Sequence, residues 1–239
     1  MPISASPQVI FEDEELLVVD KPGGMVCHSA QRPGHTSLAE WLREHGLHTP
    51  RMINRLDRET SGLVVIAKNE SAAKTLGKAV LRREIGKQYT AICHGEFVEA
   101  GGVIDQPIGL SRTSVVYTKR TVDPVAGKPS LTRFAVEKRL RRFTVVRLTP
   151  QTGRAHQLRV HLAWLGHPIV GDKIYGADET LYLRFIEHGM TDEILKKLLL
   201  PRHALHAGRV SLLHPRTRQV VEFQAPLPAD MDAFIEEHR

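Results

Sequence analysis

The amino-acid sequence predicts an α+β fold with a mixed, mostly antiparallel central sheet and flanking helices. Segments with strand-like patterns outnumber those with helical periodicity. The two kinds do not alternate regularly, as they would in a parallel α/β fold. The 239 residues contain no internal repeat and no linker-like shift in composition. We therefore expect one domain over residues 1–239, which could comprise two lobes.

The predicted strands are short and β-branched or alternating. The first two, at 9–11 and 16–19, surround an acidic turn, and a third at 63–67 follows a Ser-Gly turn. A strand at 87–95 would end at Gly95. Further strands are expected at 113–118, 129–138, 143–149, 204–213 and 219–224, and a basic tip at 138–142 would join two of them.

The predicted helices show the 3.6-residue apolar repeat. The first follows the capping-box pattern Ser37-Leu38-Ala39-Glu40. A second covers 71–83 and turns Ala72, Leu76, Ala79 and Val80 to one face. A third begins after Gly153 and runs to about 165, and the segments 180–200 and 229–237 also have helical patterns.

Charge and cysteine content narrow the class of protein. Lys and Arg number 33 against 27 Asp and Glu, which suits a polyanionic partner, although many basic proteins bind none. Cys27 and Cys93 form no paired motif, which indicates a reducing compartment. Residues 1–4 show no secretory signal, and no apolar run is long enough for a membrane span. We expect a soluble cytoplasmic monomer.

Asp57 is the first candidate for chemistry because it stands just before a predicted buried strand. The following Thr60-Ser61-Gly62 supplies hydroxyls and a flexible residue for a tight turn, so a purely structural turn is one interpretation. The flanking Arg55 and Arg58 favour an ionised carboxylate. Such a carboxylate suits a nucleophile or an anionic stabiliser better than a proton donor.

A second candidate segment, 150–159, has a glycine where a strand is expected to turn into a helix, and helix N-termini attract anions. Arg154 would stand in the first helical turn, where a cation is disfavoured, which indicates an acidic partner or a phosphate. Together with His156 and Arg159 it could form a phosphate-binding strip. An ordinary turn with surface arginines is the alternative.

The histidines do not predict a metal site. His156 and His161 would point about 140° apart on a helix, while His203 and His206 would face opposite sides of a strand. No cysteine or carboxylate stands nearby at metal-site spacing. We expect neither a structural nor a catalytic metal.

Five segments occur in a fixed order: Lys21-Pro22-Gly23-Gly24, Arg55-Leu56-Asp57-Arg58-Glu59-Thr60-Ser61-Gly62, Lys87-Gln88-Tyr89, Thr152-Gly153-Arg154-Ala155-His156-Gln157-Leu158-Arg159, and 166–172 with Tyr175-Gly176. Together they resemble the motifs of the RluA-type family of RNA pseudouridine synthases, over roughly residues 15–228. One departure is that the family usually has His where this chain has Asn54. We expect that side chain to support the site through a hydrogen bond rather than to take part in the chemistry.

The resemblance implies the pseudouridine synthase catalytic fold, without an additional N-terminal RNA-binding module. It implies isomerisation of specific uridines in structured RNA, either ribosomal or transfer RNA. Asp57 would be the catalytic carboxylate, and Tyr89 would stack on the target base and assist removal of the C5 proton. Arg154 would pair with Asp57. No cofactor is expected, since the reaction needs no redox step and no group donor.

The target uridine of a folded RNA must be flipped out of its stack. The resemblance assigns RNA or substrate contacts to six residues: Arg55, Arg58, Thr60, His156, Leu158 and Arg159. Arg55 and Arg58 could fill the gap left by the base or hold phosphates, and Leu158 would form an apolar wall. The basic tip at 138–142 could contact the RNA backbone or could simply be solvated.

Three alternatives stay open from the sequence. One is a different RNA-modifying or phosphodiester-cleaving enzyme that uses His156, His161 or His206. Another is a non-catalytic RNA-binding or ribosome-assembly factor on the same scaffold. The third is a basic protein that binds acidic proteins.

Overall fold

The computed structural model describes residues 6–28 and 37–239 and divides into two compact units. Unit 1 comprises Met1–Gln88 and His206–Leu227, and unit 2 comprises Tyr89–Leu205 and Pro228–Arg239. The chain passes between them inside β5 (Gly86–His94), at the start of β11 (Leu205–Leu213) and after residue 227. The segment 1–4, in which we expect no secretory signal, lies outside the described residues.

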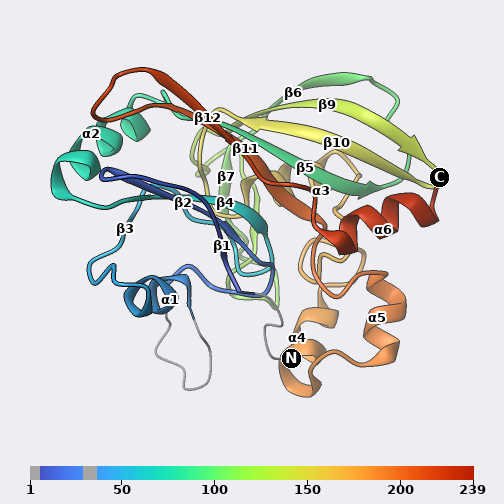
Figure 1. Ribbon diagram of the computed structural model, residues 1–239. Coiled ribbons are helices and arrows are strands. Elements are labelled where there is room, and N and C mark those ends of the chain that lie inside the picture. Colours follow the sequence, from blue (N-terminus) through green and yellow to red (C-terminus); the bar gives the residue numbers. More distant parts are fainter. Residues whose placement is uncertain (1–5, 29–36) are drawn as a thin grey trace. The chain divides into compact units, whose positions relative to one another are not determined.

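Unit 1 is built on β1 (Gln8–Glu12), β2 (Leu16–Lys21), β4 (Ser61–Ala67) and β11, in that order (Figure 1). Two further strands join it, β3 (Arg51–Met52) beside β4 and β12 (Val220–Gln224) beside β11. Only the β4–β11 pair is parallel among these pairings, so the sheet is mixed and mostly antiparallel, as predicted. Every residue of β4 is buried, which explains its continuous apolar run.

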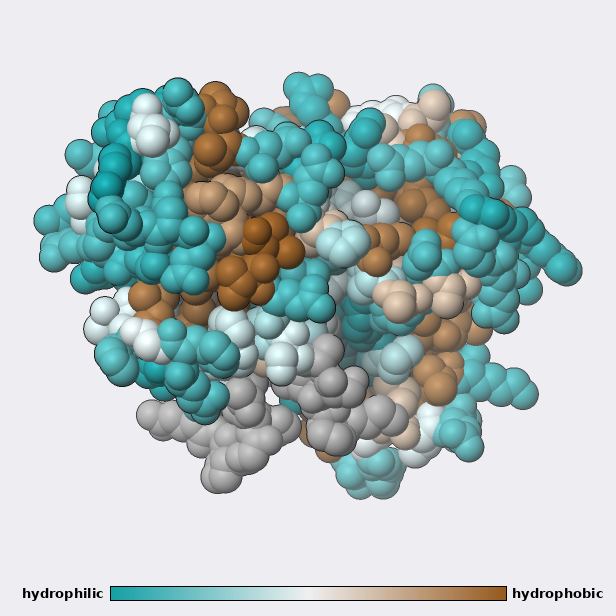
Figure 2. Space-filling model, viewed as in Figure 1, coloured by the Kyte–Doolittle hydropathy of each residue, from teal (hydrophilic) through white to brown (hydrophobic). Residues whose placement is uncertain are grey.

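Two helices belong to unit 1. The predicted capping box is confirmed at α1 (Leu38–Glu44), where Ser37 and Glu40 exchange hydrogen bonds. Helix α2 (Glu70–Leu81) packs Ala72 and Leu76 into a core that β2, β4, β11 and β12 complete. Val80, which was predicted on the same face, is 39% exposed in the last turn of the helix. Hydrophilic residues gather over α2 in Figure 2.

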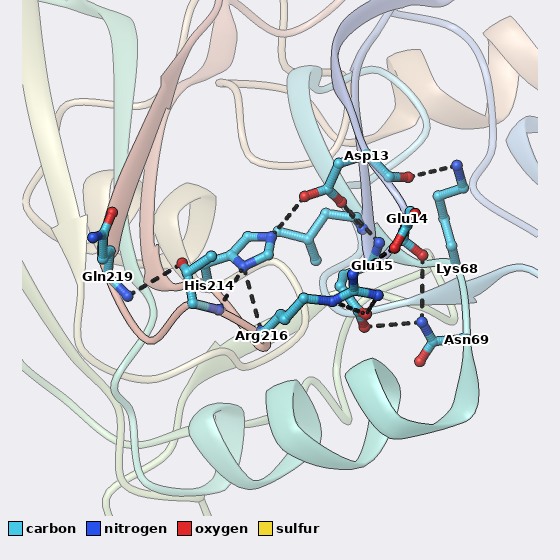
Figure 3. Close-up of polar contacts among 10 residues, drawn as sticks. Asp13, Glu14, Glu15, Lys68, Asn69, His214, Arg216 and Gln219 are labelled. Carbon is cyan, nitrogen blue, oxygen red and sulfur yellow. Dashed lines mark hydrogen bonds and ion pairs between the residues drawn. The ribbon is translucent and has the colours of Figure 1, made fainter.

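A polar cluster ties the β1–β2 turn to the β11–β12 turn within unit 1 (Figure 3). His214 Nε2 donates to Asp13 Oδ2 at 2.8 Å. The Arg216 guanidinium donates two hydrogen bonds to Glu15 Oε1, and Asn69 donates to Glu15 Oε2. The hydrogen bonds from Asn69 and Arg216 lower the pKa of Glu15. The acidic turn seen in the sequence is therefore a neutralised structural contact.

Unit 2 holds the antiparallel order β5, β10 (Phe143–Pro150), β9 (Leu131–Leu140) and β6 (Gly101–Asp105), and a separate pair of β7 (Ile108–Leu110) and β8 (Arg120–Val122). The strand predicted at 113–118 is wrong. That segment bends because Ser114 and Lys119 both donate to Glu179, each at 2.7 Å. The short strands β3, β6, β7 and β8 were not predicted.

Four helices belong to unit 2: α3 (Gln157–Trp164), α4 (Thr180–His188), α5 (Asp192–Leu198) and α6 (Ala229–Glu237). The helical segment predicted at 180–200 is thus two helices, separated where Gly189 takes a positive φ of 72°. Helix α6 lies against the tip of the β9–β10 hairpin (Figure 1), because Phe143 and Phe234 stack edge to face and Arg141 N donates to His238 O.

No helix in the described ranges is long and apolar enough to cross a membrane. Cys27 and Cys93 are both free and buried.

Candidate active site

Asp57 lies in the turn that leads into β4. Thr60 N donates to Asp57 O at 3.2 Å, which closes the turn over the two residues between them. The preceding Leu56 is buried, and its backbone N and O both meet Cys27 Sγ, at 3.4 and 3.5 Å. The backbone is therefore fixed on each side of Asp57, whose side chain is half-buried.

The segment Lys21-Pro22-Gly23-Gly24 holds the same turn. Lys21 is fully buried, and its ammonium donates to the carbonyl oxygens of Pro22, Met25 and Arg58. The contact is reciprocal, because Gly24 N donates to Arg58 O at 2.8 Å and Arg58 Nε donates to Gly24 O at 3.2 Å. A buried lysine is costly unless its donors are satisfied, so this element serves to clamp the Asp57 turn.

Asn54 anchors the start of the turn. Its Nδ2 donates to Leu63 O at 3.0 Å, and its Oδ1 accepts from Val65 N at 2.9 Å. The amide thereby continues the antiparallel pairing of β3 with β4 by one more step. The hydrogen bonding predicted for this side chain is confirmed, and its absence from the chemistry stays a prediction.

The Ser-Gly pair after the turn pins β4 to β11. Gly62 has a φ of 112°, and a Cβ there would meet Ala207 O at 2.4 Å, so only glycine fits. Ser61 Oγ lies 3.0 Å from His206 Nδ1, while His206 Nε2 lies 3.3 Å from Ala225 O. A carbonyl can only accept, so Nε2 carries the proton and Nδ1 accepts from the serine. This buried histidine has a structural role, which weakens the phosphodiester-cleaving alternative.

The residues of unit 1 that were expected to contact RNA differ in their exposure. Arg55 and Arg58 are exposed, and Arg58 also holds Gly24 as described. Thr60 is only 2% exposed. Its burial in the turn argues against the direct RNA contact expected from the sequence, so we assign Thr60 to the turn itself.

Tyr89 and Arg154 lie in unit 2. Tyr89 is half-buried on β5 and pairs with Leu148 of β10. Arg154 stands three residues before α3, where His156 takes a left-handed φ of 59°. The position predicted for Arg154 in the first helical turn is therefore wrong, and the helix-dipole argument attached to it no longer holds. The Arg154 Nε donates to Pro129 O at 3.2 Å.

The two histidines of this segment are both engaged. His156 Nδ1 lies 2.8 Å from the hydroxyl of Tyr175, whose oxygen accepts from Arg120 N. His161 is fully buried between the Thr132 hydroxyl and Gln106 O, and burial lowers its pKa. A proton-transfer role for His161 is disfavoured by this burial.

Arg159 is not part of an exposed strip, and the prediction that it faces RNA is wrong. Its guanidinium is buried and donates to both oxygens of Asp172, at 2.6 and 2.9 Å. Burial alone would raise the pKa of Asp172, but the charge and hydrogen bonds of Arg159 outweigh it and hold that pKa well below its ordinary value. Arg159 is a core residue of unit 2.

The predicted catalytic set is thus divided between the units. Asp57 stands in unit 1, whereas Tyr89, Arg154 and the buried Leu158 of α3 stand in unit 2. The predicted pairing of Asp57 with Arg154 stays a prediction. Within residues 6–28 and 37–239, no group of three His, Cys, Asp or Glu side chains could hold a metal ion.

Sequence reasoning gave no role to two residues that the structure makes prominent. Lys21 was visible only as part of a motif, and Gln157 only as a neighbour of His156. A long polar side chain beside a turn is ordinarily read as solvated. Neither the burial of these two residues nor their partners leave any local signal in the sequence.

Comparison with known proteins identifies the family. The family model of RNA pseudouridylate synthase matches residues 15–164. "Uncharacterized RNA pseudouridine synthase YlyB" of Bacillus subtilis is 37% identical over 241 residues, covering 97% of this chain and 72% of its own length. "Ribosomal large subunit pseudouridine synthase D" of Vibrio parahaemolyticus is 38% identical over 236 residues, covering 95% and 69%. The solved structure of human RNA pseudouridylate synthase domain containing 1 aligns with a TM-score of 0.72 at 26% identity, covering 97% of this chain and 94% of that one. These matches confirm the resemblance in the motifs, and the chain belongs to the RNA pseudouridylate synthase family.

Proposed function

We propose that this RNA pseudouridine synthase isomerises specific uridines of ribosomal RNA, with Asp57 as the catalytic carboxylate. The choice of RNA is supported by relatives such as the Vibrio parahaemolyticus protein, whose name places its action on the large ribosomal subunit. Transfer RNA is the alternative substrate. The reacting uridine of either folded RNA has to leave its stack to reach a carboxylate in a protein turn.

The observation that carries the role of Asp57 is the set of hydrogen bonds that hold its turn and the strand that follows. The Cys27 thiol, the Lys21 ammonium and the Asn54 amide all act on the backbone between residues 54 and 60 or on the strand that it enters. A reacting group has to be held by supporting contacts to within about 0.5 Å of its productive position. Three independent anchors on one short turn fit that requirement better than they fit an ordinary surface loop.

The reaction breaks the bond between ribose C1′ and uracil N1, after which the base turns and rejoins through C5. The C5 proton then leaves, and N1, which has lost its bond to ribose, takes up a proton, so the product has the same atoms as the substrate. Asp57 either adds to C1′ or starts an elimination from the sugar. We assign to Tyr89 the stacking of the base and help with removal of the C5 proton. We assign to Arg154 the pairing with the Asp57 carboxylate.

The remaining assignments are also proposals. The exposed Arg55 and Arg58 would contact the RNA at the flipped base, His156 would contact RNA from unit 2, and Leu158 would bound the uracil. We further propose that the two units act as one catalytic domain and that the protein works as a cytoplasmic monomer. The free thiols of Cys27 and Cys93 are compatible with that compartment.

The proposal is tested by release of tritium from RNA labelled at uridine C5. Purified protein is incubated with transcripts of large-subunit ribosomal RNA and, separately, of transfer RNA. We expect release from the ribosomal transcript and one pseudouridine position, or a few, on sequence mapping. Release from transfer RNA alone would mean that transfer RNA, and not ribosomal RNA, is the substrate. Tight RNA binding with no release from either would favour the non-catalytic RNA-binding alternative.

A further inference from the structure

One buried amide organises the turn that carries Arg154. Gln157 is the first residue of α3 and is 4% exposed. Its Oε1 accepts from Thr152 Oγ1 at 2.7 Å and from Arg154 N at 3.0 Å. Its Nε2 donates to Leu131 O and to Thr132 Oγ1, each at 3.0 Å. The side chain therefore connects the turn to strand β9, and all of these contacts lie within unit 2.

The hydrogen bonds around Gln157 allow only one assignment of donors and acceptors. His161 Nε2 faces the carbonyl of Gln106, so Nε2 carries the ring proton and Nδ1 must accept from the Thr132 hydroxyl. The hydroxyl has then given its only proton, and it accepts from Gln157 Nε2. The amide oxygen of Gln157 therefore faces Arg154 N, and the flipped orientation of the amide is excluded.

Among the described residues, Gln157 is the one that accepts a hydrogen bond from Arg154 N. The helix start at His156 is left-handed and has no side-chain cap, so the ordinary capping interaction is missing. Thr152 supports the same contact, since its hydroxyl also accepts from Leu131 N at 3.0 Å. The single hydrogen bond of the Arg154 side chain within the described chain, to Pro129 O, involves Nε alone. The direction of the guanidinium thus depends on where its backbone is held.

We propose that Gln157 is a positioning residue that sets the backbone of Arg154 and so directs its guanidinium during catalysis. The inference rests on the proposed role of Arg154. An apolar residue at 157 would leave the backbone N of Arg154 without its present acceptor, while the carbonyl of Leu131 would keep only its hydrogen bond from Gln151 N. The turn would then relax, and a displacement of about 1 Å can slow a reaction roughly 100-fold.

The test compares the wild-type protein with Gln157→Ala, and with Gln151→Ala as the matched control. Gln151 lies in the same turn but is exposed, and its side chain makes no hydrogen bond to the described residues. We expect Gln157→Ala to lower kcat roughly 10- to 100-fold, with KM and RNA affinity within about threefold of wild type. The control should match wild type in all three quantities.

Amide hydrogen exchange followed by NMR gives a readout that does not depend on activity. In Gln157→Ala the Arg154 amide should exchange at least tenfold faster, while the amides of Val160 and Leu162 in α3 stay protected. Loss of protection throughout α3 would mean that Gln157 only stabilises the fold, and an unchanged kcat would overturn the positioning role. A wild-type protein that releases no tritium would instead contradict the proposed function. The exchange result would still show whether Gln157 holds the Arg154 backbone.

Gln157→Glu is the second variant in case Gln157→Ala does not fold. A protonated carboxyl can donate one of the two hydrogen bonds that the Gln157 amide donates and can still accept at its other oxygen, whereas a carboxylate cannot donate to Leu131 O or Thr132 Oγ1. The ratio of its kcat to that of wild type should rise as the pH is lowered. A ratio that is the same at every pH at which both proteins are folded would contradict the proposed contact.

Discussion

Replacing Asp172 by Asn should destabilise unit 2 strongly, although the side chain keeps its size. Asp172 accepts four hydrogen bonds, two from Arg159 and one each from Ile174 N and Tyr175 N. Its side chain is 0% exposed, and that of Arg159 is 6% exposed. An asparagine can retain the bonds to one oxygen, but its NH₂ group would then face an arginine N–H. The guanidinium would be left buried without its counter-charge.

Removing one partner of a buried ion pair costs about 3–5 kcal/mol. For a chain of this size each kcal/mol lowers Tm by about 2–4 °C, so we expect a fall of roughly 6–20 °C. The loss should depend on pH. Because the folded-state pKa of Asp172 is lowered, its contribution is complete above the unfolded pKa of about 3.9 and is lost as the pH falls through the folded pKa. The gap between wild type and variant should be constant from about pH 7 to 5 and narrow below about 4.

Urea denaturation followed by circular dichroism measures this gap across the pH range. Asp105→Asn serves as the control, since Asp105 is exposed on β6 and its side chain makes no hydrogen bond or ion pair within the described part of the chain. The control should stay within about 0.5 kcal/mol of wild type. A loss below about 1 kcal/mol for Asp172→Asn, or a gap that widens in acid, would refute the reasoning.

Two further predictions concern Tyr89 and Asn54. Tyr89→Phe should slow a step after glycosidic cleavage, because the C5 proton loses an acceptor. Single-turnover kinetics should then show that an intermediate accumulates. Kinetics identical to wild type would exclude a role for the hydroxyl. Asn54→Asp should lower the free energy of unfolding by about 1–3 kcal/mol and reduce kcat. The reason is that a carboxylate can accept from Val65 N but cannot donate to Leu63 O. Thermal unfolding and reaction rates that match wild type would show that these hydrogen bonds are dispensable.

The parts of the fold that could be predicted have local causes. The capping box at Ser37 and Glu40 uses residues three positions apart, and the buried strand β4 is a continuous apolar run. The turn at Asp57 follows from hydroxyl and glycine residues within five positions. Such features depend on near neighbours in the chain, so the sequence alone is sufficient to predict them.

Two of the failures involve partners that are not neighbours in the chain, and a third involves a backbone conformation. The strand-like segment at 113–118 bends because Glu179, some 65 positions from Ser114, takes hydrogen bonds from it. Arg159 looked like a surface residue because nothing local reveals its partner Asp172, 13 positions downstream. The start of α3 was misplaced because His156 adopts a left-handed conformation that is rare for residues other than glycine.

The residues of the candidate site likewise differ in whether the sequence predicts them. Asp57, Tyr89 and Arg154 could be named because their motifs stand in a recognisable order. The residues that hold them could not, since the roles of Lys21 and Gln157 depend on burial and on carbonyls of distant segments.

The central claim is that the Asp57 carboxylate performs the chemistry, and one measurement tests it most directly. Asp57→Asn keeps the shape and the hydrogen-bonded turn while removing the charge. Tritium release from C5-labelled ribosomal RNA and RNA affinity are measured on the same preparation of this variant. We predict that release is abolished while affinity stays within about threefold of wild type. Retained turnover by Asp57→Asn would contradict the assignment.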